Sequence, residues 1–212
     1  MLDVPGVAPL VGAGIYYGAA TTEAAIYRGR DVCVVGGANS AGQGALFFTR
    51  YARRVVVLAR QKSLSVSMSQ YLVDRIAATT NIDVLARVEV TGACGNGHLE
   101  QVTICNLDTG QPGSIDVDAM FIFIGAAPRS DVVSAVVECD EKGFILTGPD
   151  LFRSGRKPRG WTLDRDPFFF ETSMPGVFAA GDVRAGSNRR VASAVGEGAA
   201  AIYTIHRYLE TV

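Results

Sequence analysis

The sequence lacks the features that mark several large classes of protein. Its 20 lysines and arginines are balanced by 21 acidic residues, so the net charge of −1 offers no basic surplus for nucleic acid. Only 19% of the 212 residues are charged and 48% are hydrophobic, which excludes a disordered tail. We therefore predict one large or two small globular domains without a nucleic-acid partner.

Cysteine and histidine are scarce. The four cysteines form no CxxC pair, and with two histidines the sequence contains no metal-binding Cys/His spacing. We predict four unpaired thiols, no metal site and a reducing, cytoplasmic location.

Long apolar runs are also missing. Residues 4–22 carry no charge, but prolines and glycines interrupt them, whereas a membrane span needs about 20 continuous apolar residues. Asp3 stands where a signal peptide would carry basic residues. We predict neither a membrane span nor a signal peptide.

The sequence does contain an alternation of buried strands and amphipathic helices. In chain order we expect a strand over 31–36, a helix over 40–52, a strand over 54–59, a helix over 66–79 and a strand over 82–85. On the second helix, Met68, Tyr71, Leu72 and Ile76 share one face. This order predicts a right-handed parallel sheet.

The pattern changes on both sides of this core. We expect a short helix near 21–27, strands over 87–91, 99–107 and 119–124, and turns at 95–97 and 108–110. A first domain then ends near Gly125. After it, short strands at 144–146 and 176–180 and a helix over 191–209 are too little for an independent core, which predicts a piece of a second domain.

The sharpest motif is VVGGANSA at residues 34–41, placed between a strand and a helix as a dinucleotide-binding turn requires. The first glycine permits the tight turn, and the helix N-terminus would face a pyrophosphate. An alanine replaces the second glycine of the pattern, which normally lets phosphates approach the backbone. The candidate binding residues are Gly36, Gly37, Ala38, Asn39, Ser40 and Ala41.

The end of the second strand favours NADP over NAD. Where an NAD site carries an acidic residue, this sequence has Arg60, followed by Lys62. A cation attracts a 2′-phosphate, so both are candidate ligands of NADPH. The alternative is a solvated pair of cations at a strand end.

The same turn allows a competing interpretation. Residues 38–42 (ANSAG) form a relaxed nucleophile elbow around Ser40, and His206 lies downstream as in a serine hydrolase. Against it, His206 falls inside the predicted C-terminal helix, and a helix cap or phosphate contact suits Ser40 better.

A further motif lies near the C-terminus. Gly181 and Asp182 end a predicted strand, where a carboxylate could accept hydrogen bonds from ribityl or ribose hydroxyls. Arg190, Val191 and Ala192 open the last helix, whose N-terminus offers donors to an anion or ring oxygen. The alternative is a turn aspartate that caps a helix.

Together these motifs resemble the thioredoxin reductase family of FAD-dependent pyridine nucleotide-disulfide oxidoreductases. The resemblance is carried by residues 34–41, 122–129 (IFIGAAPR), 172–183 (TSMPGVFAAGDV) and 190–192 (RVA), in this order. It implies an α/β fold: a Rossmann-like NADPH-binding domain with a parallel sheet and a β-meander over residues 29–125. Residues 1–28 would arrive from an FAD-binding domain, and residues 126–212 would be its C-terminal portion.

The resemblance also implies roles for individual residues. Residues 36–41 would bind the NADPH pyrophosphate, Arg60 the 2′-phosphate, and Asp182 the flavin ribityl chain. Residues 190–192 would lie beside the isoalloxazine. Ile124, Gly125 and Gly181 complete the implied cofactor contacts.

Three departures from the family pattern matter. The N-terminal half of the FAD domain, with its own glycine-rich turn, is absent, which indicates a truncated product or fragment with an incomplete FAD site. The redox CxxC positions fall on Ala19 and Thr22. The other 2′-phosphate arginines fall on Gln61 and Ser65, where Lys62 would partly compensate.

The resemblance therefore implies an oxidoreductase that passes hydride from NADPH to FAD and on to an unidentified acceptor without a redox CxxC. A ferredoxin, a quinone, oxygen or an external thiol are the candidate acceptors, and the family implies a homodimer. The alternative is an inactive NADP-binding fragment or regulatory module.

Overall fold

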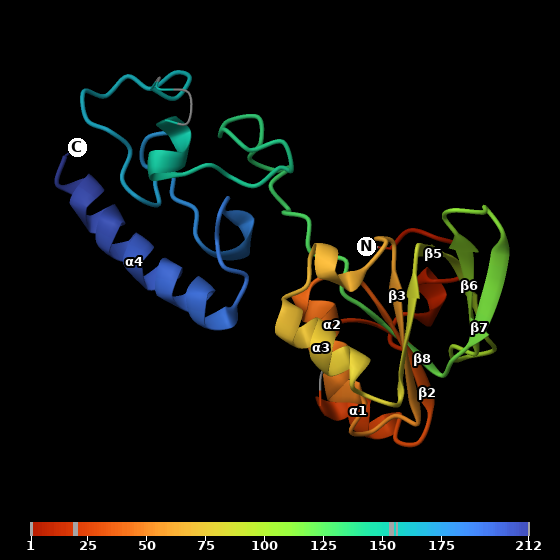
Figure 1. Ribbon diagram of the computed structural model, residues 1–212. Helices are drawn as coiled ribbons and strands as arrows, with labels where there is room; N and C mark the ends of the chain where they lie inside the picture. Colours follow the sequence, from red (N-terminus) through yellow and green to blue (C-terminus); the bar gives the residue numbers. More distant parts are fainter. Residues whose placement is uncertain (1, 19–20, 153–154, 156, 212) are drawn as a thin grey trace. The chain divides into compact units, whose positions relative to one another are not determined.

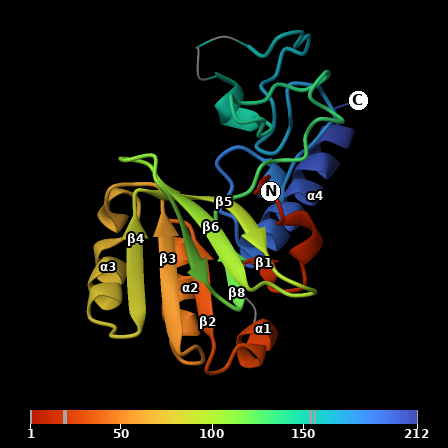
Figure 2. The ribbon, with the colours of Figure 1, turned by 90° about the vertical axis from the view of Figure 1, so that its right-hand side faces the viewer.

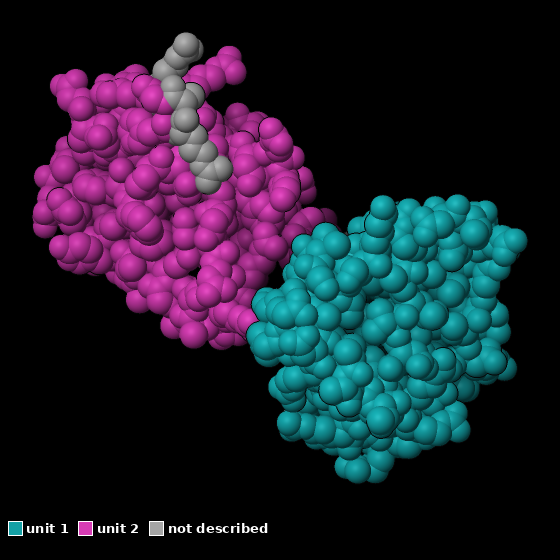
Figure 3. Space-filling view, viewed as in Figure 1, with its two compact units in different colours: residues 1–125 teal, residues 126–212 magenta. Residues whose placement is uncertain are grey.

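A computed structural model describes residues 2–18, 21–152, 155 and 157–211 (Figure 1). The chain divides into two compact units, Met1–Gly125 and Ala126–Val212, coloured separately in Figure 3. The division falls where the sequence analysis places the end of the first domain.

Unit 1 is built around a five-stranded parallel sheet, in the order β1-β8-β2-β3-β4 (Figure 2). Its strands are β1 (Ile15–Tyr17), β2 (Asp31–Val35), β3 (Arg54–Ala59), β4 (Ile82–Ala86) and β8 (Ala119–Ile122). In the register, Val34 lies between Val57 of β3 and Phe121 of β8. The parallel sheet and its three consecutive strands β2, β3 and β4 confirm the prediction.

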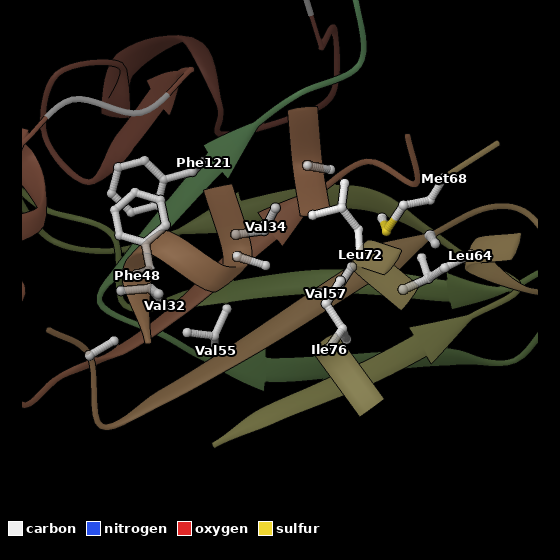
Figure 4. Packing of buried hydrophobic residues seen from close by; sticks show 14 of the residues in the cluster. Val32, Val34, Phe48, Val55, Val57, Leu64, Met68, Leu72, Ile76 and Phe121 are labelled. Carbon is white, nitrogen blue, oxygen red and sulfur yellow. The ribbon is translucent and has the colours of Figure 1, made fainter. Parts of the chain in front are cut away.

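Three helices cover one face of this sheet (Figure 1). They are α1 (Thr21–Ile26), α2 (Asn39–Phe48) and α3 (Gln70–Ala77). Because side chains alternate along a strand, every second residue of β2, β3 and β8 joins the helices in one apolar cluster. Figure 4 shows Phe48 of α2 against Phe121, with ring centroids 3.9 Å apart, and Leu72 and Ile76 of α3 near Val57.

The second helix is shorter than the predicted 66–79. A 3₁₀ turn, η2 (Leu64–Val66), comes first, and the Ser63 side chain accepts a hydrogen bond from the Ser65 N–H there. Serine hydroxyls compete with helical backbone bonds in this way, so α3 begins only at Gln70. Tyr71 is 54% exposed rather than on the buried face, and Met68 is buried from a position before the helix.

An antiparallel sheet covers the other face. Its strands are β5 (Val88–Cys94), β6 (Gln101–Asn106) and β7 (Pro112–Asp116), and β7 was not predicted because glycine and proline open it. The alternate residues of β2, β3 and β8, such as Cys33 and Val56, pack here against Val88, Val90 and Val102. The described thiols are all unpaired, as predicted, and Cys33 is buried in this layer.

The N-terminal residues belong to unit 1, which differs from the predicted separation of residues 1–28. Val7 and Leu10, at the 3₁₀ turn η1 (Ala8–Leu10), are buried in the cluster beneath the antiparallel sheet. Ile15 pairs with Met120, so β1 extends the sheet itself. The assignment of residues 1–28 to an FAD-binding domain, which follows the resemblance, stays a prediction.

Unit 2 contains one long helix, α4 (Val191–Leu209), with the predicted bounds. The rest of its described residues form irregular chain with two 3₁₀ turns, η3 (Gly148–Phe152) and η4 (Gly181–Val183). The strands predicted at 144–146 and 176–180 are reduced to isolated bridges, Ile145 with Arg184 and Phe178 with Glu171. Among the described residues, no helix of either unit is long and apolar enough to cross a membrane.

Candidate nucleotide-binding site

The turn between β2 and α2 is closed by a glycine that no other residue could replace without strain. Gly36 has φ +145°, and a Cβ at this position would lie 2.6 Å from the Phe123 carbonyl oxygen and 3.0 Å from the Ala41 Cβ. The close approach of β2, β8 and α2 thus depends on the absence of a side chain, and the buried Ala41 keeps the helix near the strand.

The N-terminus of α2 is open to an anion. Its N-cap, Ala38, makes no side-chain cap bond, and the first turn holds no acidic residue. The first N–H groups of a helix lack intrahelical partners and carry partial positive charge, which suits a pyrophosphate. Asn39 is oriented elsewhere, because its Oδ1 accepts a 2.7 Å hydrogen bond from the Ser69 N–H and ties α2 to the start of α3.

The space beside Gly37 is occupied by the side chain of Gln61, which follows the end of β3. Gln61 Nε2 donates to the Gly37 carbonyl at 2.8 Å and to Ser67 Oγ at 2.7 Å, and Ser67 Oγ donates to the same carbonyl at 3.1 Å. A Cβ on Gly37 would collide with the Gln61 amide. Gln61 stands where the resemblance implies an arginine for the 2′-phosphate, and its uncharged side chain instead supports the glycine turn. Residue spacing alone did not reveal this supporting role.

A cavity of about 580 Å³ opens beside this turn, at the carboxyl ends of β2, β3 and β8. Ligand pockets typically have this size, and parallel sheets bind nucleotides at this edge. Six predicted residues line it: Gly36, Gly37, Ala38, Arg60, Ile124 and Gly125. The cavity suits a dinucleotide because it combines an open helix N-terminus, apolar walls from Val35 and Leu58, and a cation at the rim.

Four other predicted residues of unit 1 lie outside this lining. Asn39, Ser40 and Ala41 belong to the first turn of α2, and Lys62 is exposed beyond Arg60. Other lining residues, including Asp3 and Glu89, come from segments that the sequence analysis did not assign to the site. The sequence did not indicate a site in these segments, because their other lining residues are apolar and typical of a core: Leu2, Val4, Val88 and Val90.

Charged residues of both signs line the cavity: Arg60 and the carboxylates Asp3 and Glu89. Arg60 and Lys62 are exposed and form no ion pair with a described residue, whereas Arg87 pairs with Asp108 at 2.7 Å. A hydrogen bond from Arg87, with a smaller contribution from the charge of Lys62, holds the pKa of Asp108 below its usual range. Asp108 thus stays ionised beside Arg87 and Lys62.

In unit 2, the predicted flavin residues lie in two places: the turn η4, where Gly181 is buried and Asp182 exposed, and the start of α4. Gly181, with φ +76°, donates its N–H to Glu197 Oε2 at 2.7 Å, and Glu197 also pairs with Arg184 at 2.7 Å. This network fixes the turn to α4 and leaves the Asp182 carboxylate exposed. An exposed acceptor of this kind fits a ribityl or ribose hydroxyl.

The N-terminus of α4 is equally open. Arg190 is its N-cap and forms no side-chain cap bond, Val191 is 84% exposed, and Ala192 is exposed. The free N–H groups of this first turn fit a ring oxygen of a flavin.

The hydrolase alternative gains no support from the described residues. Ser40 lies in the regular first turn of α2, without the strained backbone of a nucleophile elbow. His98 lies 3.8 Å from Glu100 in the β5–β6 hairpin, and His206 belongs to α4 in unit 2. Nor do three or more Cys, His, Asp or Glu side chains gather as metal ligands within the described ranges.

Unit 1 has an α/β fold of the Rossmann type, as its parallel sheet and the glycine turn after β2 define. The family model of pyridine nucleotide-disulphide oxidoreductases matches residues 1–198, and the chain belongs to this family. The match confirms the resemblance inferred from the motifs.

Individual relatives agree with this assignment. The chain is 33% identical over 208 residues to a thioredoxin reductase of Mycolicibacterium smegmatis, covering 98% of this chain and 60% of the relative. It is 28% identical over 208 residues to a 34.2 kDa protein in the rubredoxin operon of Clostridium pasteurianum, with the same coverage of 98% and 60%. The chain thus spans about 60% of the length of these curated relatives.

Solved structures show the same relationship. The thioredoxin reductase of Lactococcus lactis in the FR conformation matches with a TM-score of 0.79 at 26% identity, covering 100% of this chain and 63% of that one. The enzyme of Streptococcus pyogenes matches with a TM-score of 0.65 at 31% identity, covering 100% and 62%.

Proposed function

We propose that this chain is the NADPH-binding part, with a portion of the FAD-binding part, of a thioredoxin-reductase-like flavoprotein oxidoreductase. The observation that carries the proposal is the 580 Å³ cavity at the carboxyl ends of β2, β3 and β8, with Gly36 at its turn and Arg60 at its rim. The N–H groups at the start of α2 would hold the pyrophosphate. Arg60 and Lys62 would hold the 2′-phosphate.

The exposed Asp182 and the exposed start of α4 in unit 2 support an FAD site. Gly181 and Asp182 would face the ribityl chain, and Arg190, Val191 and Ala192 would face the flavin ring. When bound, NADPH supplies a hydride and FAD accepts it. Because the chain spans about 60% of its curated relatives, the complete FAD site, a homodimer and turnover are proposed only for the whole protein.

We propose an electron acceptor other than an internal disulfide. The cysteines at positions 33, 94, 105 and 139 contain no CxxC. Of the two positions where the family pattern places that pair, Ala19 lies outside the described residues and Thr22 belongs to α1. The same departure favours the second candidate, an NADP-binding fragment or regulatory module without turnover.

Calorimetric titration of the full chain with NADPH and NADH tests the proposal. We expect selective binding of NADPH, and Arg60→Ala should weaken it about tenfold while changing NADH binding less than twofold. Arg54→Ala is the matched control, because Arg54 opens β3 at the opposite end of the sheet. A wild-type chain that binds neither dinucleotide contradicts the proposal.

A spectrum separates the two candidates. After incubation with FAD and desalting, a retained band near about 450 nm supports the oxidoreductase, and its bleaching by NADPH supports hydride transfer. A colourless chain that still binds NADPH favours the binding module.

A further inference from the structure

Arg87 has a backbone conformation that no other described non-glycine residue shares. It joins β4 to β5 with φ +58°, in the left-handed region. This region is uncommon for residues with a side chain, and asparagine, aspartate or glycine usually occupy it. Outliers of this kind cluster at functional sites, where the surrounding structure holds them in place.

The backbone of Arg87 is held on both sides. Its N–H donates to the Gln61 carbonyl at 3.2 Å, and its carbonyl accepts from the Leu107 N–H at 2.7 Å. These bonds attach the β4–β5 connection to the segment that follows β3. They set Arg87 beside the residue that braces the glycine turn.

The side chain reaches the backbone of Arg60, a residue that lines the cavity. Arg87 Nη1 lies 3.5 Å from the carbonyl oxygen of Arg60, whose side chain lines the cavity. Two cationic side chains thus start from backbone segments in direct contact, although 27 positions separate them in the sequence.

Asp108 occupies one edge of the Arg87 guanidinium, and on the other edge the only hydrogen bond of Nη1 to a described residue is the 3.5 Å bond to the Arg60 carbonyl. Nε and Nη2 both donate to Asp108 Oδ1, at 2.9 and 2.7 Å. That single oxygen takes the Nε–Nη2 edge and leaves the terminal edge, formed by Nη1 and the second Nη2 hydrogen, outside the pair with Asp108. The side chain is 33% exposed, so this fork is accessible to an anion.

The local charge at the ends of β3 and β4 favours a phosphate group. Arg60, Lys62 and Arg87 carry three positive charges, and Asp108 carries one negative charge. These four residues leave a local surplus of two at the ends of β3 and β4, while Asp3 and Glu89 line the cavity elsewhere. A phosphate monoester carries about −1.5 to −2 at neutral pH, so it would be attracted to this end of the site. Arginine binds such a group through two parallel N–H donors.

We propose that Arg87 is a second phosphate-binding residue of this site and reads the 2′-phosphate of the nucleotide together with Arg60. The inference rests on the proposed function, because it presumes that the cavity takes a dinucleotide. Arg87, in the β4–β5 connection, would then supply the positive charge that Gln61, at the end of β3, does not carry.

Calorimetric titration of Arg87→Asn tests this role. Asparagine tolerates the left-handed backbone, so the variant removes the cation and keeps the turn. The probes are two pairs that differ in the 2′-phosphate: NADPH against NADH, and 2′,5′-ADP against 5′-AMP. We expect the Kd of NADPH and 2′,5′-ADP to rise about tenfold, with NADH and 5′-AMP changed less than twofold.

Two further variants sharpen the result. Arg87→Lys keeps the charge and loses the fork, so it should bind NADPH between wild type and Arg87→Asn. Arg54→Asn removes an exposed, ion-paired arginine at the other end of the sheet, and it should leave the preference for NADPH unchanged.

The outcomes separate this inference from the proposed function. If the wild-type chain binds neither dinucleotide, both are overturned. If the wild-type chain prefers NADPH and both Arg87 variants keep the full preference, only the role of Arg87 is overturned. An equal loss of NADPH and NADH affinity also overturns it, because NADH has no 2′-phosphate and removing a residue that binds only this group should leave NADH affinity unchanged.

Discussion

Replacing Glu171 by glutamine should destabilise unit 2 by about 3 kcal/mol. Its side chain is fully buried, and each carboxylate oxygen receives two donors. Oε2 accepts from Arg165 Nη1 at 2.7 Å and from the Phe168 N–H at 2.8 Å, and Oε1 accepts from Arg165 Nη2 at 2.9 Å and from the Gly176 N–H at 3.0 Å.

The magnitude follows from these four contacts. Glutamine keeps the shape, but its NH₂ group would face two donors in place of an oxygen. Two hydrogen bonds to a charged acceptor are lost, each worth about 1.5–3 kcal/mol. The Arg165 side chain is 23% exposed and regains some water, which limits the loss to the lower end of the roughly 3–5 kcal/mol range for a broken buried pair.

The change should also alter the response to acid. Burial raises the pKa of Glu171, but the Arg165 guanidinium and the two backbone N–H groups outweigh it and hold the pKa below its usual value. A carboxyl with a lowered folded-state pKa stabilises the protein fully above its unfolded pKa, about 4.3. That contribution is lost as the pH falls through the folded pKa, so the stability of wild type and variant should converge on acidification.

The chain carries its own probe for this experiment. Trp161 is the single tryptophan, and its Nε1 donates to the Arg165 carbonyl at 2.7 Å. Urea unfolding followed by tryptophan fluorescence, at neutral pH and near pH 4, therefore reports on this cluster. Glu141→Gln, at an exposed turn, is the matched control. A free energy of unfolding for Glu171→Gln that differs from wild type by less than about 0.5 kcal/mol at neutral pH would refute the reasoning.

Three further predictions concern unit 1. Gly36→Ala should weaken NADPH binding at least about tenfold, because the added methyl meets the Phe123 carbonyl; unchanged calorimetric affinity would contradict the assigned turn. Phe48→Ala should destabilise the unit by about 3–5 kcal/mol in circular-dichroism melts, since its fully buried ring stacks on Phe121. The Cys33 thiol, whose pKa is raised by burial, should react with a disulfide reagent only after unfolding, whereas the exposed Cys94 should react in the native state. Rapid modification of Cys33 in the folded chain would contradict its burial.

Much of the sheet could be predicted because buried parallel strands leave a strong local signal. β3 is a run of β-branched and apolar residues between arginines, and its bounds match the prediction to the residue. α4 is equally clear, since its alanine-rich helical spacing is uninterrupted. The strands predicted for unit 2 were wrong because a strand needs a neighbour, and the described chain supplies single bridges in place of ladders.

The candidate site was predictable only where one residue type carries the chemistry. Gly36 and Arg60 stand at fixed offsets from a strand end, so the pattern singles them out. The Gln61 brace and the left-handed Arg87 depend on contacts between the ends of β3 and β4 that no local spacing encodes. Their cofactor roles stay predictions until the titrations are made.

The place of β8 in the sheet has a consequence for how the chain matures. β8 is the last strand of unit 1 to be synthesised, yet it lies between β1 and β2 and is the sheet partner of β1. Non-local pairings of this kind form late and leave apolar surface uncovered during synthesis. On the ribosome, more than a hundred further residues must therefore be synthesised before β1 can pair with β8 and its apolar neighbours become buried. A nascent chain that stalls before Ala119 would expose both this segment and the unpaired edge of β2, which makes it a candidate for chaperone capture.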